Sequence, residues 1–90
     1  MYRIEFTHQY LKDLRLARTR NLDEEKLNEV IRILASGSEL PRKYLNHKLS
    51  GKYRGLKECH ILPDWLLIYA SNKTLKLITL IRTGTHGDLF

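Results

Sequence analysis

The sequence has little cysteine, and it has no long hydrophobic run. Its single cysteine, Cys59, excludes an internal disulfide framework and fits a reducing compartment. No apolar segment approaches the ~20 residues that span a bilayer, and the first residues lead into a mixed-polarity stretch rather than a signal peptide. One cysteine and no pair of histidines at helical spacing also argue against a structural zinc motif. We therefore expect a soluble, cytoplasmic protein without a membrane partner.

Acidic residues are scarce in one part of the chain, and this matters more than the net charge of +6. Residues 1–39 carry seven Lys or Arg against seven Asp or Glu, whereas residues 40–60 carry six cations against Glu58 alone. The 90 residues suffice for one domain, 1–90, with its own core. Such a cationic stretch serves either solubility or the binding of a polyanion, and the polyanion is the sharper hypothesis.

The hydrophobic pattern predicts two helices followed by a β-rich half. Thr7 suits a helix N-cap, Asn21 with Glu24 resembles a capping box, and Gly37 suits a helix stop. No titratable residue interrupts the apolar face of either helix. The expected elements are a strand at 2–6, helices at 9–20 and 22–36, and strands at 53–61, 65–70 and 74–82. Residues 38–52 form a long connection with at most a short strand near 47–49.

The run from Trp65 to Ala70 is the most apolar of the chain and is typical of a central strand buried on both faces. The order β-α-α-β-β-β then predicts an α+β fold, in which two amphipathic helices form an antiparallel pair on one side of an antiparallel sheet. Strand parity places Glu58 and His60 on one face of their strand, but the pattern does not say which face holds the core.

Histidines are concentrated near the ends of the predicted strands. His47, His60 and His86 all lie in the second half of the chain, and Asp64 follows a proline just after His60. RNA can be cleaved without a metal if one group removes the proton of the 2′-hydroxyl and another protonates the 5′-oxygen. Histidine suits both steps, because its ordinary pKa leaves both forms populated near neutrality. Arg82 and the lysines would stabilise charge on phosphorus.

Each of these residues also has a simpler structural explanation. A histidine beside a turn is more often a surface residue than a catalyst, and Asp64 after Pro63 is ordinary turn chemistry. Trp65 is expected in the core more often than at a stacking site. Arg82 could pair with Glu58. Three histidines with Asp64 would bind a metal only if the fold gathered them.

A longer pattern of residues carries a family resemblance. It resembles the YafQ branch of the RelE superfamily of bacterial toxins, which are the toxin halves of type II toxin–antitoxin pairs. The helices match only in pattern, and the specific part of the resemblance runs from His47 to Phe90. The matching residues are His47-x-Leu49-x-Gly51, Gly55, Cys59-His60-x-x-Pro63-Asp64-Trp65-x-Leu67-Ile68-Tyr69 and Arg82-Thr83-Gly84-Thr85-His86-x-x-Leu89-Phe90.

The resemblance implies a RelE-like fold and an endoribonuclease that cleaves mRNA, usually on the ribosome, with no metal or other cofactor. It implies an antitoxin partner, through which alone the toxin would contact operator DNA. His86 would be the general acid and either Asp64 or His47 the base. The implied catalytic set is His47, His60, Asp64, His86 and Phe90. Residues expected to contact RNA or its phosphates are Lys48, Lys52, Arg54, Trp65 and Arg82.

Two other classes of function remain open at this point. A toxin of the same fold in the ParE branch poisons a protein target such as DNA gyrase, and it would not need His60, Asp64 and His86 together. A non-catalytic RNA-binding module would need only the basic stretch and the aromatic residues. For a toxin, we expect the antitoxin to present an acidic, partly disordered segment that covers the basic surface and blocks RNA.

Overall fold

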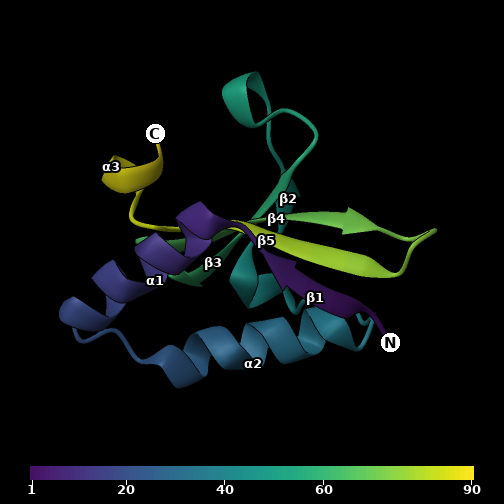
Figure 1. The fold of residues 1–90 in the computed structure, drawn as a ribbon, viewed down its shortest axis with the longest axis horizontal. Coiled ribbons are helices and arrows are strands. Elements are labelled where there is room, and N and C mark those ends of the chain that lie inside the picture. Colours follow the sequence, from purple (N-terminus) through teal and green to yellow (C-terminus); the bar gives the residue numbers. More distant parts are fainter.

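A five-stranded mixed sheet with the strand order β1-β5-β4-β3-β2 organises the computed structural model, which describes residues 1–90. Helices α1 and α2 lie on one side of this sheet, and the loop after β2 and helix α3 lie on the other (Figure 1). No helix is both long and apolar enough to cross a membrane. In chain order the elements are β1 (Arg3–Phe6), α1 (His8–Thr19), α2 (Glu24–Ala35), η1 (Arg42–Tyr44), β2 (His47–Lys48), η2 (Gly51–Tyr53), β3 (Lys57–Leu62), β4 (Trp65–Asn72), β5 (Leu77–Gly84) and α3 (His86–Leu89).

The α+β fold with two helices on one sheet is confirmed, and the short strand near residue 47 exists as β2. The sheet is not wholly antiparallel, however, because β1 pairs with β5 in parallel, with Ile4 opposite Ile78. The other three pairings are antiparallel. The parallel direction of β1 was not predicted because its partner strand lies more than 70 residues away in the sequence. No local sequence pattern indicates how two such distant strands pair.

The helix ends follow local chemistry. The Thr7 side chain accepts a hydrogen bond from the backbone N–H of Tyr10, as predicted for the N-cap of α1. The N-cap of α2 is Asp23, whose carboxylate accepts from Glu25, and not Asn21. Asn21 instead takes a positive φ of 57° in the turn between the helices. Asparagine tolerates this left-handed conformation, so the turn uses it there.

Strand β4 is buried on both faces, as its sequence predicted. One face carries Trp65, Leu67 and Tyr69 into the core beneath α1 and α2. The opposite face carries Leu66 and Ile68 into a smaller cluster. The smaller cluster is completed by the buried residues Tyr53 and Leu89. The sheet therefore has a helical core on one side and a second, thinner layer on the other.

A buried carboxylate on α1 corrects two expectations. Asp13 is 8% exposed and accepts from both Nε and Nη2 of Arg82 at 2.9 Å and from the Thr83 backbone N–H at 3.2 Å. A titratable residue thus does interrupt the face of α1, and Arg82 pairs with Asp13 rather than with Glu58. The reason is topological: β1 ends opposite Leu80, so the next part of the β5 edge needs another hydrogen-bond partner.

The charge of Asp13 is retained in this position. Burial acts to raise the pKa of its carboxyl, but hydrogen bonds from Arg82, Gln9 and Thr83 outweigh burial and lower it. A carboxyl whose pKa falls on folding stabilises the fold above its unfolded pKa. That stabilisation is lost as the pH falls through the folded pKa.

The close contact between Gly84 and helix α3 makes a testable prediction. A Cβ at Gly84 would lie 2.9 Å from Asp88 Oδ2, and that carboxylate cannot move freely because it binds Arg20 at 2.6 Å and the Thr85 N–H at 2.9 Å. Gly84→Ala should therefore cost about 1–3 kcal/mol of unfolding free energy. Gly87→Ala is the matched control, because its Cβ would meet nothing closer than 3.7 Å. Urea denaturation compares the variants, and equal stabilities would contradict the clash.

Candidate active site

Three residues from β2 and β3 gather on the sheet face opposite the helical core. His47 pairs with Glu58 across the two strands, and His60 lies two residues further along β3, so all three side chains share one face. His47 Nε2 is 3.3 Å and His60 Nε2 is 3.6 Å from Glu58 Oε1. The predicted parity of Glu58 and His60 is thereby confirmed. Two imidazoles flank one carboxylate.

His86 and Asp64 form a second pair beside the first group. Asp64 lies in the turn between β3 and β4, and its Oδ1 accepts both the backbone N–H of His86 at 2.9 Å and the His86 Nδ1–H at 2.6 Å. These two hydrogen bonds lower the pKa of the exposed Asp64 carboxyl. Asp64 is thus a charged residue that fixes the position of a histidine, which is more than turn chemistry requires.

The three histidines form a continuous row. Ring centroids are 6.1 Å apart between His47 and His60 and 5.8 Å apart between His60 and His86. The row crosses from β2 through β3 to the start of α3, so segments separated by up to 39 positions meet. The structure therefore brings together four of the residues expected from the sequence, the three histidines and Asp64.

Hydrogen bonds set the tautomers at both ends of the row. His47 Nδ1 lies 2.7 Å from the carbonyl oxygen of Leu45, which can only accept, so Nδ1 carries the proton. His86 Nδ1 likewise donates to Asp64. His86 Nε2 is left for chemistry, and His47 Nε2 lies 3.3 Å from Glu58 Oε1. This arrangement can move one proton at His47 and another at His86.

Glu58 is the residue that the sequence analysis missed. It was placed on the same strand face as His60 and weighed as a partner for Arg82, but it was given no role in the site, yet it lies 4% exposed between two histidines. Its Oε2 atom has no hydrogen-bond partner at all. The available signal was the Glu58-x-His60 spacing in a strand, because residues two apart project from the same face.

Phe90 follows helix α3, and contacts with Tyr53 fix its position. Its ring is 61% exposed and meets Tyr53 edge-on, with centroids 5.3 Å apart. The Tyr53 hydroxyl donates to the backbone carbonyl of Leu89 at 2.8 Å. An exposed aromatic ring on a fixed base is suited to stacking against an unpaired nucleobase.

Trp65 does not offer such a surface. It is 1% exposed in the helical core, and its Nε1–H donates to Thr83 Oγ1 at 2.9 Å. The proposed stacking role is therefore wrong for this structure, and the alternative weighed from the sequence, a core residue at the start of β4, holds. Its burial follows from strand parity, because Trp65, Leu67 and Tyr69 share the face covered by the helices.

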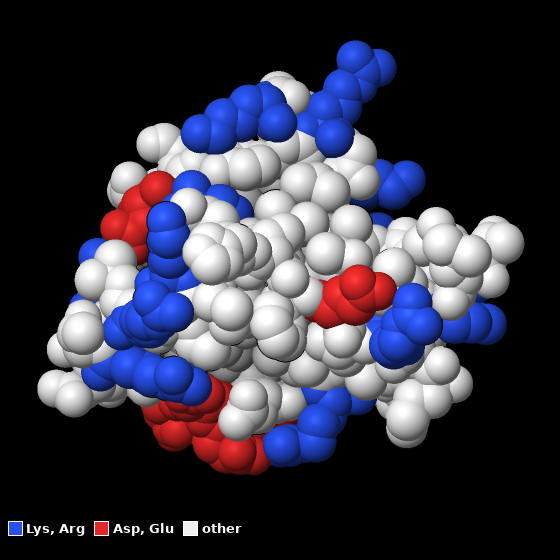
Figure 2. All heavy atoms as spheres, viewed as in Figure 1, with Lys and Arg blue, Asp and Glu red and all other residues white.

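Exposed cations project from the end of β2 and from the loop between β2 and β3. Lys48, Lys52 and Arg54 are all exposed, and Figure 2 shows Lys and Arg side chains without acidic neighbours over this loop, at the top of the view. Arg82 differs, because its side chain is 24% exposed and its guanidinium is bound by Asp13. Lys48, Lys52 and Arg54 are therefore available to bind phosphates, whereas Arg82 can contact a phosphate only through the exposed part of its side chain.

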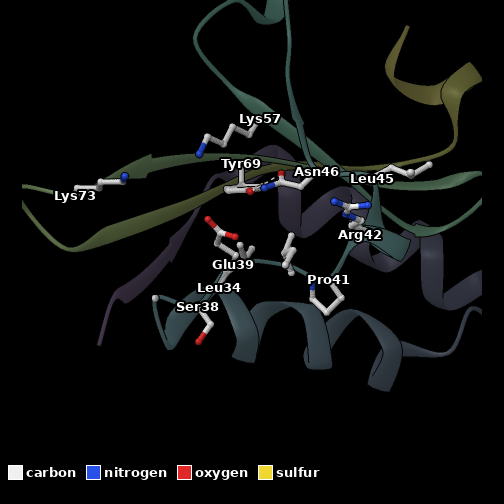
Figure 3. A pocket seen from close by; sticks show the side chains of 12 residues that line it. Leu34, Ser38, Glu39, Pro41, Arg42, Leu45, Asn46, Lys57, Tyr69 and Lys73 are labelled. Carbon is white, nitrogen blue, oxygen red and sulfur yellow. Dashed lines mark hydrogen bonds between the residues drawn. The ribbon is translucent and has the colours of Figure 1, made fainter.

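The largest hollow of the molecule is on the other side of the sheet. It measures about 690 Å³ and lies between the end of α2, the loop that follows it and the sheet (Figure 3). Lys57 and Tyr69 line it, and these residues face away from Glu58 and His60. This groove and the row of histidines are therefore separate sites.

Comparisons with known proteins show which family the chain belongs to. A model of the family described as "Bacterial toxin of type II toxin-antitoxin system, YafQ" matches residues 2–90. The chain is 42% identical to the mRNA interferase toxin YafQ of Escherichia coli strain K12, over 97% of this chain and 94% of that protein. Among solved structures, the E. coli DinJ–YafQ complex matches with a TM-score of 0.91 at 37% identity, over 100% of this chain and 99% of that one. A metal-bound toxin from Helicobacter pylori matches with a TM-score of 0.92 at 36% identity, over the whole of both chains. The chain therefore belongs to the YafQ family of bacterial type II toxin–antitoxin toxins.

Proposed function

We propose that this protein is the toxin of a toxin–antitoxin pair and cleaves mRNA in the bacterial cytoplasm while ribosomes translate it. The observation that carries the proposal is the row of three histidines with Asp64 bound to His86. The E. coli relative is named as an mRNA interferase, and its YafQ branch supplies the substrate class. A toxin that acted only by binding a protein target would have no use for this arrangement.

The reaction we propose is an internal transesterification of RNA. His47 Nε2 takes the proton of the 2′-hydroxyl, and the 2′-oxygen forms a bond to phosphorus. The bond from phosphorus to the 5′-oxygen breaks, and His86 Nε2–H gives its proton to that leaving oxygen. The products are a 2′,3′-cyclic phosphate and a free 5′-hydroxyl, so atoms and protons balance. Each proton transfer contributes ~10²- to 10⁴-fold to the rate.

The two carboxylates act through the histidines in this scheme. Asp64 was one of the two candidate bases, but its Oδ1 is engaged by two N–H groups of His86, so we assign it to positioning His86. His47 is then the base. Glu58 Oε1, 3.3 Å from His47 Nε2, stabilises the positive charge that forms there. His60 lies between the two and stabilises the phosphorane.

The remaining residues of the site bind and orient the substrate. Lys48, Lys52 and Arg54 are exposed beside the row and contact the phosphates of the strand. Phe90 stacks on a base next to the cleaved bond, which is worth ~1–3 kcal/mol. Arg82 is held by Asp13 and adds positive charge from behind the site.

The test of this function is a substrate that lacks one hydroxyl. An RNA with a single 2′-deoxyribose at the cleaved position should bind as well as the unmodified RNA but remain uncut, because the nucleophile is missing. The unmodified RNA should yield a 2′,3′-cyclic phosphate or its 3′-phosphate hydrolysis product. Binding and product analysis, with and without ribosomes, give both readouts. Cleavage of the deoxy substrate would exclude the 2′-hydroxyl as nucleophile.

We further propose that an acidic segment of a cognate antitoxin docks in the groove of Figure 3 and keeps the toxin inactive. The groove combines apolar residues, among them Leu34, Leu40 and Leu45, with three cations, Arg42, Lys57 and Lys73, and a single carboxylate, Glu39. The support is charge: none of these three cations forms an ion pair within the chain, and an acidic chain would supply one. Operator DNA would be contacted only through that antitoxin.

A competition experiment tests this partner surface. Titrating antitoxin against toxin-bound RNA should release the RNA, because we propose that the segment runs from the groove, where Arg42 and Lys57 already belong to the basic stretch, onto the rest of that stretch. Arg42→Glu and Lys73→Glu should weaken antitoxin binding while the exposed, charge-matched change Lys12→Glu on α1 should not. Simultaneous binding of RNA and antitoxin at saturation would contradict occlusion. Equal effects of all three changes would remove the groove from the interface.

A further inference from the structure

The C-terminal segment of the chain carries two groups of the proposed reaction, the His86 imidazole and the Phe90 ring. Its helix, α3, has only four residues. A single helical turn is unstable in isolation, because fixing its backbone costs more free energy than its few hydrogen bonds return. The position of both groups therefore depends on bonds between this segment and the rest of the molecule.

The C-cap residue of α1 supplies a two-point bond of this kind. Arg20 Nη1 and Nη2 donate to the two carboxylate oxygens of Asp88 at 2.6 and 3.2 Å. Asp88 is the third residue of α3, and its Oδ2 also accepts the backbone N–H of Thr85, the N-cap of that helix, at 2.9 Å. The side chains of Arg20 and Asp88 are 38% and 24% exposed, so water screens this pair less than a pair that lies fully in solvent. The bond ties the end of α1 to the first turn of α3.

Helix α1 is in turn fixed to the sheet, so Arg20 starts from a defined position. Asp13 accepts the backbone N–H of Thr83 on β5, and Thr7 Oγ1 at the start of α1 donates to the Ile81 carbonyl at 2.7 Å. These contacts hold α1 along the edge of β5. The position of the sheet is thereby passed through α1 and Arg20 to the C-terminal helix.

Arg20 also balances two carboxylates on either side of His86. Its hydrogen bond to Asp88 raises the pKa of the guanidinium, and the negative charges of Asp88 and Asp64 raise it further. Hydrogen bonds from His86 lower the pKa of the Asp64 carboxyl, whereas the charge of Asp88 opposes that effect. Without Arg20 the two carboxylates would repel each other, and the repulsion would push α3 away from the turn that contains Asp64.

We propose that Arg20 is a positioning residue for His86 and Phe90, which holds α3 docked through Asp88 and so keeps the general acid beside the RNA. This role rests on the proposed function, because it concerns the residues assigned to that reaction. Arg20 acts through Asp88 and takes no part in proton transfer. Docking itself is a property of the free protein and can be measured without RNA.

Hydrogen exchange of the α3 amides measures docking. The N–H groups of Asp88, Leu89 and Phe90 donate to the carbonyl oxygens of Thr85 and His86, so they are protected only while the helix is formed. In Arg20→Gln these amides should exchange about 10-fold faster, because a hydrogen-bonded ion pair is lost, while the amides of β4 keep their rates.

The matched control lies on the same helix. Arg18 forms a similar two-point pair with Glu24, at 2.7 and 3.0 Å, and this pair does not involve α3. Arg18→Gln should therefore leave the exchange of the α3 amides unchanged. Arg20→Lys retains the positive charge and one hydrogen bond, so it should recover part of the protection.

Cleavage assays then test the positioning role. At saturating RNA, Arg20→Gln should cut about 10-fold more slowly than the unmodified chain, Arg20→Lys should recover part of the rate, and Arg18→Gln should cut at the original rate. In the background of Asp88→Asn, Arg20→Gln should have little further effect, because its partner has already lost its charge. Additive losses would show that Arg20 does not act through Asp88.

The two measurements separate the positioning role from the proposed function. If Arg20→Gln loosens α3 but even the unmodified chain cuts no RNA, the proposed function fails and docking by Arg20 stands. Equal α3 exchange in Arg20→Gln and Arg18→Gln, or an equal acceleration in β4, would overturn docking. A full cleavage rate of Arg20→Gln would overturn positioning, and a loss confined to RNA affinity would make Arg20 a phosphate contact instead.

Discussion

His86→Gln is expected to lower the rate of RNA cleavage by ~10²-fold or more, while RNA affinity stays within a few-fold of the original. His86 Nδ1 is held by Asp64 at 2.6 Å, so Nε2 is the atom that meets the leaving oxygen. A general acid acts mainly in the transition state, and its loss therefore appears in the cleavage step rather than in binding. Glutamine preserves a hydrogen-bonding side chain but cannot donate and recover a proton at neutral pH.

Two further variants test whether the loss of activity is specific to the general acid. Asp64→Asn keeps the shape of the residue that orients His86, so a partial loss of activity should result, smaller than that of His86→Gln. His8→Gln changes a histidine of α1 that is remote from the row, and its activity should equal that of the unmodified chain. Single-turnover cleavage and RNA binding, measured separately, give the comparison. Full activity of His86→Gln would remove the general acid from the mechanism.

Trp65→Ala is expected to have the largest effect on stability, with a loss of about 3–5 kcal/mol of unfolding free energy. The indole is 1% exposed in the helical core, and its removal leaves a cavity beside Leu67 and Tyr69. The change also leaves Thr83 Oγ1 without the Trp65 Nε1–H donor. The free energy of unfolding of a small domain is only ~5–15 kcal/mol, so this single change removes a large part of the stability of the fold.

Matched variants separate the core role of Trp65 from a role in RNA binding. Trp65→Phe retains most of the buried ring and loses the hydrogen bond to Thr83, so it should cost only about 1–2 kcal/mol. Phe90→Ala should leave stability nearly unchanged and weaken RNA binding, because that ring is 61% exposed. Denaturant unfolding and RNA affinity are measured on all three. If Trp65→Ala were as stable as the unmodified chain but bound RNA weakly, the core role of Trp65 would be contradicted and the hypothesis that it stacks on a base would be supported.

The start of α1 and the central strand were readable from the sequence because they depend on neighbouring residues, whereas the N-cap of α2 was wrongly placed at Asn21. Thr7 caps α1 through a residue three positions on, and the apolar run of β4 reports burial on both faces directly. The histidines and Asp64 were recognisable as candidates because their side-chain chemistry and the resemblance of the surrounding pattern do not require coordinates.

What the sequence did not determine are the meetings of distant segments. Asp13 binds Arg82 because α1 takes over the edge of β5 where β1 ends, and Trp65 is buried because its face of β4 is the one that the helices cover. Glu58 became part of the site only when β2 paired with β3 and placed His47 opposite it. The composition and local periodicity fix which groups this protein possesses, whereas tertiary pairing decides which of them share a face, a hydrogen bond or a proton.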